Sequence, residues 1–292
     1  MAEYRFESGV IAEMTLPGGE KALLEYDRFR PGMITLVVDD TPQSQVDLDD
    51  PSALGFEYVQ RIGNVIDLIG DPGQPISAVH LGAGALTLPR YVLATRPGSR
   101  QQVIEIEQAL VEFVREHLPL PRDSGIRVRY GDAREKLGNL PPAMRGNTDL
   151  VVVDVFSGAR IPAHVTTVEF YREVAELVSP TGLVAVNIAD GPGLQFARGQ
   201  AATLVETFGE VAALAETQIL KGRRFGNVVL VASPGQLPLE WLPRLMAAGP
   251  HPAKVVAGRE LRDFIAGAPV VTDATAVASP LPGKSIFQLP RN

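Results

Sequence analysis

The sequence predicts an α/β protein in which a doubly wound, mostly parallel sheet follows a small antiparallel β unit. Residues 1–60 alternate apolar and polar side chains between glycine- and proline-containing turns, a pattern typical of antiparallel strands. From about residue 61 to residue 235, short apolar runs alternate with stretches of helical periodicity. Such alternation predicts parallel strands covered by helices on both faces of one sheet.

The chain is expected to divide into an N-terminal β-strand domain (1–60), a central α/β domain (61–235) and a C-terminal extension (236–292) that is helical or irregular. A helix with one apolar face is expected at 54–69, because apolar residues recur there every three or four positions. The other expected strands are 78–81, 102–106, 126–130, 150–153, 183–187 and 228–232, and the other expected helices are 109–118, 168–178, 200–211, 241–249 and 258–267.

Composition and charge exclude several classes of protein. The 292 residues include no cysteine, which excludes disulfides, thiolate metal sites and a cysteine nucleophile. The formal net charge of −7 disfavours nucleic-acid binding, which usually needs a basic surplus. The start lacks a secretory signal, no apolar run approaches the ~20 residues of a membrane span, and the histidines lack metal-ligand spacing. We therefore expect a cytoplasmic protein without a metal site, a membrane partner or a nucleic-acid partner.

Three groups of residues stand where strands of the predicted parallel sheet end. The turn Gly82-Ala83-Gly84 follows the first of these strands, Glu105 ends the second and Asp132 follows the third. Ligands of open parallel sheets bind outside such strand ends. Backbone at the glycines can approach a ligand closely, and the two carboxylates could bind a ribose and an adenine amino group. The order of the three groups favours an adenosine-containing ligand.

Each of these groups also has a simpler explanation. The glycines could serve only tight packing, Glu105 could be a solvated strand end, and Asp132 could cap the following helix. A dinucleotide-binding turn is disfavoured because Thr87 stands where a third glycine is expected.

Asp154 is the fourth candidate, since it directly follows the apolar run 150–153 and should face the same crevice. A catalytic group would be placed at such a strand end. The alternative is that Asp154 caps its own loop through the amides of Phe156 or Ser157. The sequence contains neither a Gly-x-Ser-x-Gly motif nor a Gly-Lys-Ser/Thr phosphate loop.

With these residues in place, the chain from about 30 to 235 resembles the spermidine synthase family, aminopropyltransferases built on the Rossmann-like class I methyltransferase fold. "LVVDDTPQS" is similar to the family's strand, turn and glutamine, which implies that Gln43 lies near the nucleoside. In "GFEYVQRI", Tyr58 matches the tyrosine of a Tyr-His pair. The later "VVTDATAVASP" looks like the tail of variants in which this domain is fused to a transporter.

The remaining motifs imply roles for the strand-end residues. "VIEIE" is similar to the motif that supplies the ribose ligand, which implies that role for Glu105. "GDA" matches the family's Gly-Asp, which implies that Asp132 and Ala133 contact the nucleoside. The segment 149–188 is similar to the catalytic strand and the helix that follows it, so Asp154 is expected to be catalytic with Tyr58 assisting.

Three positions depart from the family pattern. Ala85 stands where the family has an aspartate that holds the amine of the aminopropyl group, and Ser157 replaces a second acid. Val59 replaces the histidine of the Tyr-His pair. The nucleoside half of the site therefore looks intact, whereas the half that binds amines does not.

The resemblance implies transfer of an aminopropyl group from decarboxylated S-adenosylmethionine to a small amine such as putrescine, with no tightly bound cofactor. The alternatives are a methyltransferase that uses S-adenosylmethionine itself, or a non-catalytic protein that binds a nucleoside or a polyamine. A homodimer is expected.

Overall fold

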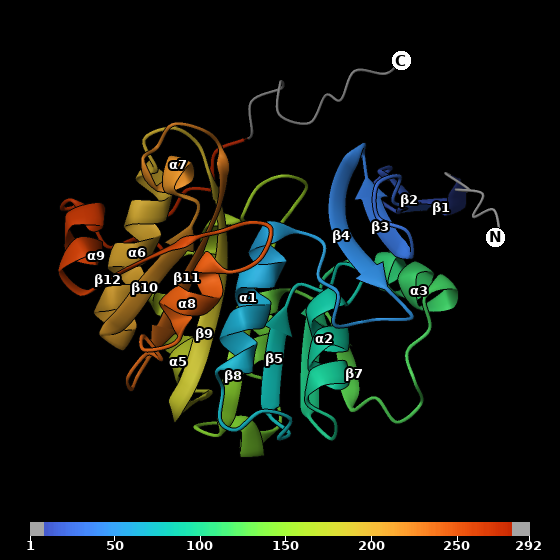
Figure 1. Cartoon of the computed structure of the whole chain (residues 1–292), viewed down its shortest axis with the longest axis horizontal. Coiled ribbons are helices and arrows are strands. Elements are labelled where there is room, and N and C mark those ends of the chain that lie inside the picture. The colour runs from blue at the N-terminus through green and yellow to red at the C-terminus, as the bar shows by residue number, and fades with distance from the viewer. Residues whose placement is uncertain (1–8, 282–292) are drawn as a thin grey trace.

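The computed structural model describes residues 9–281, in which a small sheet lies beside a larger one (Figure 1). The small sheet is antiparallel, and its strands follow the order of the chain. This sheet is the N-terminal β unit that the alternating pattern predicted, apart from residues 1–8, which lie outside the described residues. Its strands are β1 (Val10–Thr15), β2 (Lys21–Tyr26), β3 (Met33–Val38) and β4 (Thr41–Asp47).

The larger sheet has eight strands in the order β12-β10-β11-β9-β8-β5-β6-β7. The five strands from β9 to β7 are mutually parallel, whereas β11, β10 and β12 continue the sheet through antiparallel pairs. The bounds are β5 (Ser77–Leu81), β6 (Arg100–Glu105), β7 (Ile126–Tyr130), β8 (Thr148–Val153), β9 (Val178–Asp190), β10 (Glu210–Ala215), β11 (Gly226–Ser233) and β12 (Lys254–Ala257).

Helices cover both faces of this sheet, which confirms the doubly wound α/β prediction. Apolar side chains of α1 (Glu57–Asp67), α2 (Thr87–Thr95) and α8 (Leu242–Ala247) pack on one face. Those of α4 (Ala133–Leu137), α5 (Val168–Ala175), α6 (Gln195–Phe208) and α9 (Gly258–Ile265) pack on the other. The short helices are η1 (Pro142–Met144), η2 (Ala163–Val165) and α7 (Thr217–Leu220).

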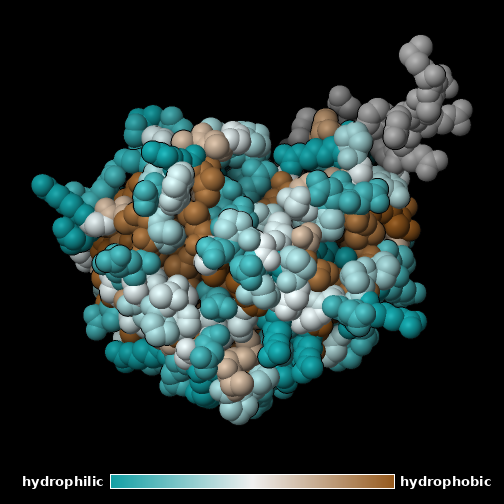
Figure 2. Space-filling model, turned by 60° about the horizontal axis from the view of Figure 1, so that its bottom comes forward, coloured by the Kyte–Doolittle hydropathy of each residue, from teal (hydrophilic) through white to brown (hydrophobic). Residues whose placement is uncertain are grey.

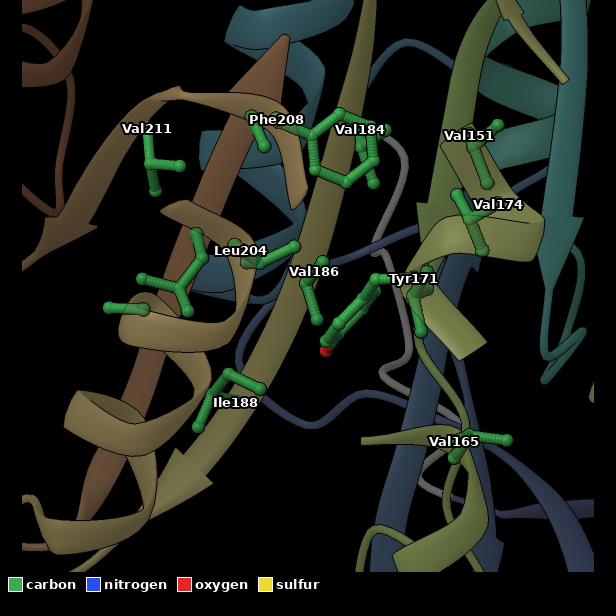
Figure 3. Close-up of a cluster of buried hydrophobic side chains, with 14 of the residues drawn as sticks. Val151, Val165, Tyr171, Val174, Val184, Val186, Ile188, Leu204, Phe208 and Val211 are labelled. Carbon is green, nitrogen blue, oxygen red and sulfur yellow. The ribbon is translucent and has the colours of Figure 1, made fainter. Parts of the chain in front are cut away.

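The long strand β9 shows how the two faces are separated. Its residues point alternately to opposite sides, as strand geometry requires. Val184, Val186 and Ile188 belong to the core that also contains Leu204 and Phe208 of α6, the cluster drawn in Figure 3. The residues between them in the strand, such as Leu183 and Ala185, belong to the core beneath α1.

The helix α3 (Gln108–His117) joins the two sheets. Its Val111 packs against Val103 of β6, while Phe113 and Val114 belong to a cluster with Leu36 of β3. The N-terminal sheet is therefore attached to the edge of the larger sheet through apolar contacts (Figure 1).

Two strands, β10 and β12, were not expected from the sequence. A helix was expected at 200–211, but α6 ends at Phe208, where Gly209 adopts a φ of 80°, and β10 follows at once. The alanine-rich β10 carries little intrinsic preference for a strand, and its pairing with both β11 and β12 determines its conformation. The strand β12 lies in the segment expected to be helical or irregular.

The segment 269–281 is irregular, as expected, and it is bound to the loop that follows β8. The Ile161 amide donates to Ser279 Oγ at 2.8 Å, and the Ser279 amide donates back to the Ile161 carbonyl at 3.0 Å. Arg160 Nε donates to the Ser279 carbonyl at 2.6 Å. The rest of the predicted irregular end, residues 282–292, lies outside the described residues.

The surface shown in Figure 2 is mainly hydrophilic, with smaller hydrophobic areas between the polar residues. Within residues 9–281, no helix has an apolar stretch of the length that a bilayer requires.

Ala85 packs against the N-terminal sheet. Its side chain is fully buried in the cluster formed by β3, β4 and α3, together with Leu36, Val46 and Phe113. An acid at this position would therefore be surrounded by apolar groups.

Replacing Ala85 with aspartate is expected to destabilise the protein by ~3–5 kcal/mol, because an unpaired carboxylate would be buried. Denaturant unfolding followed by circular dichroism measures the loss. Ser157→Asp is the matched control, since it adds the same charge at an exposed position and should barely change stability. Wild-type stability in Ala85→Asp would contradict the burial of this side chain.

Candidate active site

Four of the predicted site residues meet at the carboxyl edge of the parallel strands. Gly82 follows β5, Glu105 ends β6, Asp132 follows β7 and Asp154 follows β8. In the sheet, β5 lies between β6 and β8, so the chain leaves β5 in one direction and later returns on its other side. This reversal of strand order is where open α/β sheets bind ligands.

The glycine turn after β5 is shaped by its contacts with two other segments. Gly82 has a φ of 93°, and a Cβ there would lie 2.1 Å from the carbonyl oxygen of Asp154. Gly84 has a φ of 50°, and a Cβ there would lie 2.3 Å from Ser44 Oγ of β4. Tight packing, the simpler explanation for the glycines, thus accounts for both positions.

Glu105 is held in one orientation by backbone amides. Its Oε2 accepts from the Ala83 amide and its Oε1 from the Glu107 amide, each at 2.9 Å. A carboxylate oxygen has two lone pairs, so each oxygen keeps one for a further donor. A half-buried carboxylate fixed in this way can accept hydrogen bonds from two neighbouring hydroxyl groups.

Asp132 caps the N-terminus of α4, which was the simpler of the two explanations for this residue. Its Oδ1 accepts from the amides of Arg134 and Glu135 at 2.9 and 3.1 Å. Its Oδ2 lies 2.7 Å from His164 Nε2. Burial alone would raise the pKa of Asp132, but these hydrogen bonds outweigh it and leave the pKa below its ordinary value. Beneath this residue, Ala133 is buried in the core of the larger sheet.

Asp154 is the most strongly perturbed of the three strand-end carboxyl groups. Burial raises its pKa to about 6, although hydrogen bonds from Asn187 and Tyr58 favour the ionised form. Asn187 Nδ2 donates to Asp154 Oδ1 at 2.8 Å. The Ser157 amide binds the carbonyl of Arg160 instead, at 2.8 Å. A carboxylate with this pKa can take up a proton near neutral pH.

Tyr58 lies in the first turn of α1 and its hydroxyl is paired with Asp154. Burial, followed by the charge of Asp154, raises the pKa of Tyr58 well above its ordinary value. The phenol therefore stays protonated and can donate a hydrogen bond to Asp154. Its neighbour Val59 faces the other way, into the core beneath α1.

Gln43 is in β4, one residue before Ser44. The pairing of β3 with β4 shifts register between Leu36 and Val37, so Gln43 is the extra residue of a bulge. Bulges redirect side chains and often occur beside active sites. The place of Gln43 near a nucleoside stays a prediction.

Three residues that the sequence did not single out belong to this region. Asn187 is 3% exposed and holds Asp154, and His164 binds Asp132. Ile106 directly follows Glu105 in the chain, and its apolar side chain is 66% exposed. Asn187 could have been noticed as an amide in the otherwise apolar run "LVAVNI", whereas the sequence carried no signal for His164.

Within the described part of the chain, no group of three or more carboxylate or histidine side chains is arranged to hold a metal ion.

Comparisons with known proteins found relatives in sequence and in structure. No family model matches the chain. A polyamine aminopropyltransferase from Chromobacterium violaceum is 26% identical over 149 residues, 51% of this chain and 54% of that protein. An eEF1A lysine and N-terminal methyltransferase from Danio rerio is 26% identical over 130 residues, 42% of this chain and 19% of that protein. The chain thus spans about half the length of the aminopropyltransferase that it matches.

A solved structure extends the similarity to nearly the whole chain. The crystal structure of a probable spermidine synthase from Corynebacterium glutamicum has a TM-score of 0.79 and is 29% identical, and the match covers 97% of this chain and 99% of that one. The small antiparallel sheet and the larger mixed sheet are therefore shared features. In sequence and in fold, the chain is therefore similar to members of the spermidine synthase family.

Proposed function

We propose that this chain binds an adenosyl sulfonium donor and transfers an aminopropyl group from it to an amine. The observation that carries the proposal is the half-buried Asp154, which is held by Asn187 and Tyr58 beside the glycine turn and whose pKa is raised by desolvation. A carboxylate whose pKa is about 6 is ionised above that pH and can accept the proton of an attacking amine.

In this transfer, the lone pair of the amine attacks the aminopropyl carbon bonded to the sulfonium. The new carbon–nitrogen bond forms as the carbon–sulfur bond breaks, and the bonding electrons pass to sulfur, leaving neutral methylthioadenosine. The amine proton goes to the Asp154 carboxylate, and the Tyr58 hydroxyl stabilises and orients that carboxylate. Positioning the two reactants in line accounts for most of the acceleration in such a displacement.

The nucleoside of the donor is assigned to the other strand ends. Glu105 has a free lone pair on each oxygen for the ribose hydroxyls, and Asp132 has one on Oδ2 for the adenine amino group. We assign Gly82, Gly84, Gln43 and Ala133 to the same nucleoside site.

The donor is decarboxylated S-adenosylmethionine or S-adenosylmethionine itself, used as a co-substrate, and the acceptor is a small amine such as putrescine. We further propose a cytoplasmic homodimer.

A domain boundary at residue 60, as expected from the sequence, would fall inside α1. Because α1 carries Tyr58, we propose to group this helix with the central domain.

A methyltransferase is the second candidate, and the surroundings of the two replaced acids favour it. Ala85 is buried among apolar side chains, and Ser157 is exposed in a turn closed by Arg160. Neither position offers a charge that would hold the ammonium group of a decarboxylated donor. The sequence relative from Danio rerio is itself named a methyltransferase. A non-catalytic nucleoside or polyamine binder would share the nucleoside contacts but show no turnover.

Replacing Glu105 with alanine is expected to weaken methylthioadenosine binding roughly tenfold to a hundredfold, because a charge-assisted hydrogen bond contributes about 1.5–3 kcal/mol. Isothermal titration calorimetry measures the change. Glu112→Ala is the matched control, since Glu112 is an exposed residue of α3 outside the crevice. Equal affinity in wild type and Glu105→Ala would show that Glu105 does not bind the ribose.

Asp154→Asn is expected to lower the rate of aminopropyl transfer by about 10²–10⁴ while methylthioadenosine affinity barely changes. The amide preserves the size of the side chain but cannot take up the proton. Single-turnover assays with decarboxylated S-adenosylmethionine and putrescine test this expectation. A mutant that keeps its rate but loses stability would show that Asp154 serves only the fold.

The rate should rise with pH through the pKa of Asp154, about 6 in the wild type. Asn187 lowers that pKa by stabilising the ionised form, so Asn187→Ala should shift the rise in rate to higher pH. Rate profiles of the two proteins, measured side by side, give the shift. A profile that stays in place would show that Asp154 is not the group that titrates.

The two candidate functions imply different relative affinities for S-adenosylmethionine and its decarboxylated form. Because no acid replaces Ala85, S-adenosylmethionine should bind about as well as its decarboxylated form. Calorimetric titration with both compounds measures this. A preference beyond roughly a hundredfold for the decarboxylated form, about 2.7 kcal/mol, would show that another acid holds its ammonium group.

A further inference from the structure

A pocket of about 930 Å³ lies where strand β9 ends, and the proposed nucleoside contacts do not use it. Its walls are the loop after β9, the start of α6, the residues just before β11 and the segment 269–281. Three prolines line it, and its larger apolar side chains are Phe196, Phe225, Val271, Val277 and Leu281. This pocket, called the β9-end pocket below, is therefore lined largely by apolar groups.

The charged groups of the β9-end pocket are poorly suited to hold a cation. Among the described residues that line it, Asp190 is the only acid and Arg224 the only base. Asp190 is 3% exposed, and its two oxygens accept from the amides of Gly191 and Ala197 at 2.7 and 2.9 Å. Arg224 is ion-paired with Glu216 at 2.7 Å and would repel an ammonium group. An apolar chain fits these surroundings better than a charged one.

Strand β9 connects this pocket with Asp154, the proposed acceptor of the amine proton. Asn187, which donates to Asp154, lies in β9 three residues before Asp190. Three residues of strand span about 10 Å, at ~3.3 Å per residue. The odd spacing turns the side chains of Asn187 and Asp190 to opposite faces of the sheet. A ligand that reaches from Asp154 into the pocket therefore passes over the carboxyl end of β9.

The loop after β8 provides a second connection between Asp154 and the pocket. Three residues after Asp154, the Ser157 amide donates to the Arg160 carbonyl at 2.8 Å. Arg160 in turn donates from Nη2 to the Ala278 carbonyl at 3.1 Å and from Nε to the Ser279 carbonyl at 2.6 Å. Ala278 lines the pocket, and Ser279 is fully buried beside it in the chain. The turn that follows Asp154 is thus bonded to one wall of the pocket.

We propose that the β9-end pocket receives the tail of the acceptor, and that the preferred acceptor is a primary amine with a long apolar chain. The amine lies at Asp154, the chain crosses the end of β9, and its far end lies among the apolar side chains of the pocket. Ser157 is exposed in the turn between them and offers no charge for a second ammonium group. This inference rests on the proposed function and specifies its acceptor, whichever group the donor transfers.

The test is calorimetric titration of the full chain, saturated with methylthioadenosine, at a pH well above the pKa of Asp154, about 6. Two ligands with the same carbon chain are compared: decylamine, and decamethylenediamine, which has an ammonium at each end. We expect decylamine to bind at least about tenfold more tightly, because the second ammonium would lose its water without gaining a partner. Butylamine should bind more weakly than decylamine, by about fourfold for each methylene that no longer enters the pocket.

Substitutions at the two ends of the bound chain locate it. Val277→Asp puts a carboxylate on the pocket wall at a position that is 67% exposed. It should weaken decylamine binding and strengthen diamine binding, each several-fold. Asp154→Asn removes the charge beside the amine and should weaken decylamine binding at least about tenfold. Val10→Asp is the matched control, since it makes the same change at a position of β1 that is 55% exposed, and should keep the wild-type affinities.

The outcomes separate this inference from the proposed function. Tighter binding of decylamine that depends on both Val277 and Asp154 supports the inference. Equal or tighter binding of the diamine by wild type overturns it, as does decylamine affinity that stays unchanged in Val277→Asp or in Asp154→Asn, or that changes equally in Val10→Asp. Each of these results leaves the proposed function standing. Absence of methylthioadenosine binding by folded wild type overturns the proposed function and this inference with it.

Discussion

The close approach of Gly82 to Asp154 is the constraint on which the site depends. The Asp154 amide donates to the Leu81 carbonyl at 2.9 Å, and the Asp154 carbonyl oxygen lies only 2.1 Å from where a Cβ of residue 82 would be. Only glycine lets the end of β8 lie against the end of β5 in this way. The same turn donates the Ala83 amide to Glu105. One backbone contact thus sets the catalytic candidate and the ribose candidate relative to each other.

The other half of the site depends on a buried arginine. Arg61 of α1 is 2% exposed, donates from Nη1 to the Asn227 carbonyl at 3.3 Å, and its Nη2 lies 3.7 Å from Glu216. These partners stand at the start of β11 and after the end of β10. The antiparallel extension of the sheet therefore helps to position α1, and with it Tyr58. Removing one partner of such a buried charge is costly, so the contact ties the helix firmly to the sheet.

Two aspartates at the same edge of the sheet acquire opposite properties from their surroundings. Asp154 is surrounded mainly by buried groups, and burial raises its pKa to about 6. Asp132 is more exposed and accepts hydrogen bonds from two amides and His164, which lower its pKa. Environments that separate the pKa values of two carboxyl groups also separate their roles. The first is suited to taking up a proton, and the second to remaining a charged acceptor.

The sequence by itself determined the α/β class, the parallel strands from β5 to β9 and the strand-end positions of Glu105, Asp132 and Asp154, because apolar runs and helical periodicity are local patterns. The tertiary structure decided the contacts between distant segments, which local patterns do not specify. It made a strand of alanine-rich β10 through pairing on both sides, and it buried Ala85 against the N-terminal sheet. It also placed Asn187 on Asp154 and His164 on Asp132. The last two contacts join residues 33 and 32 positions apart, and their geometry follows from strand order and packing, which local sequence does not encode.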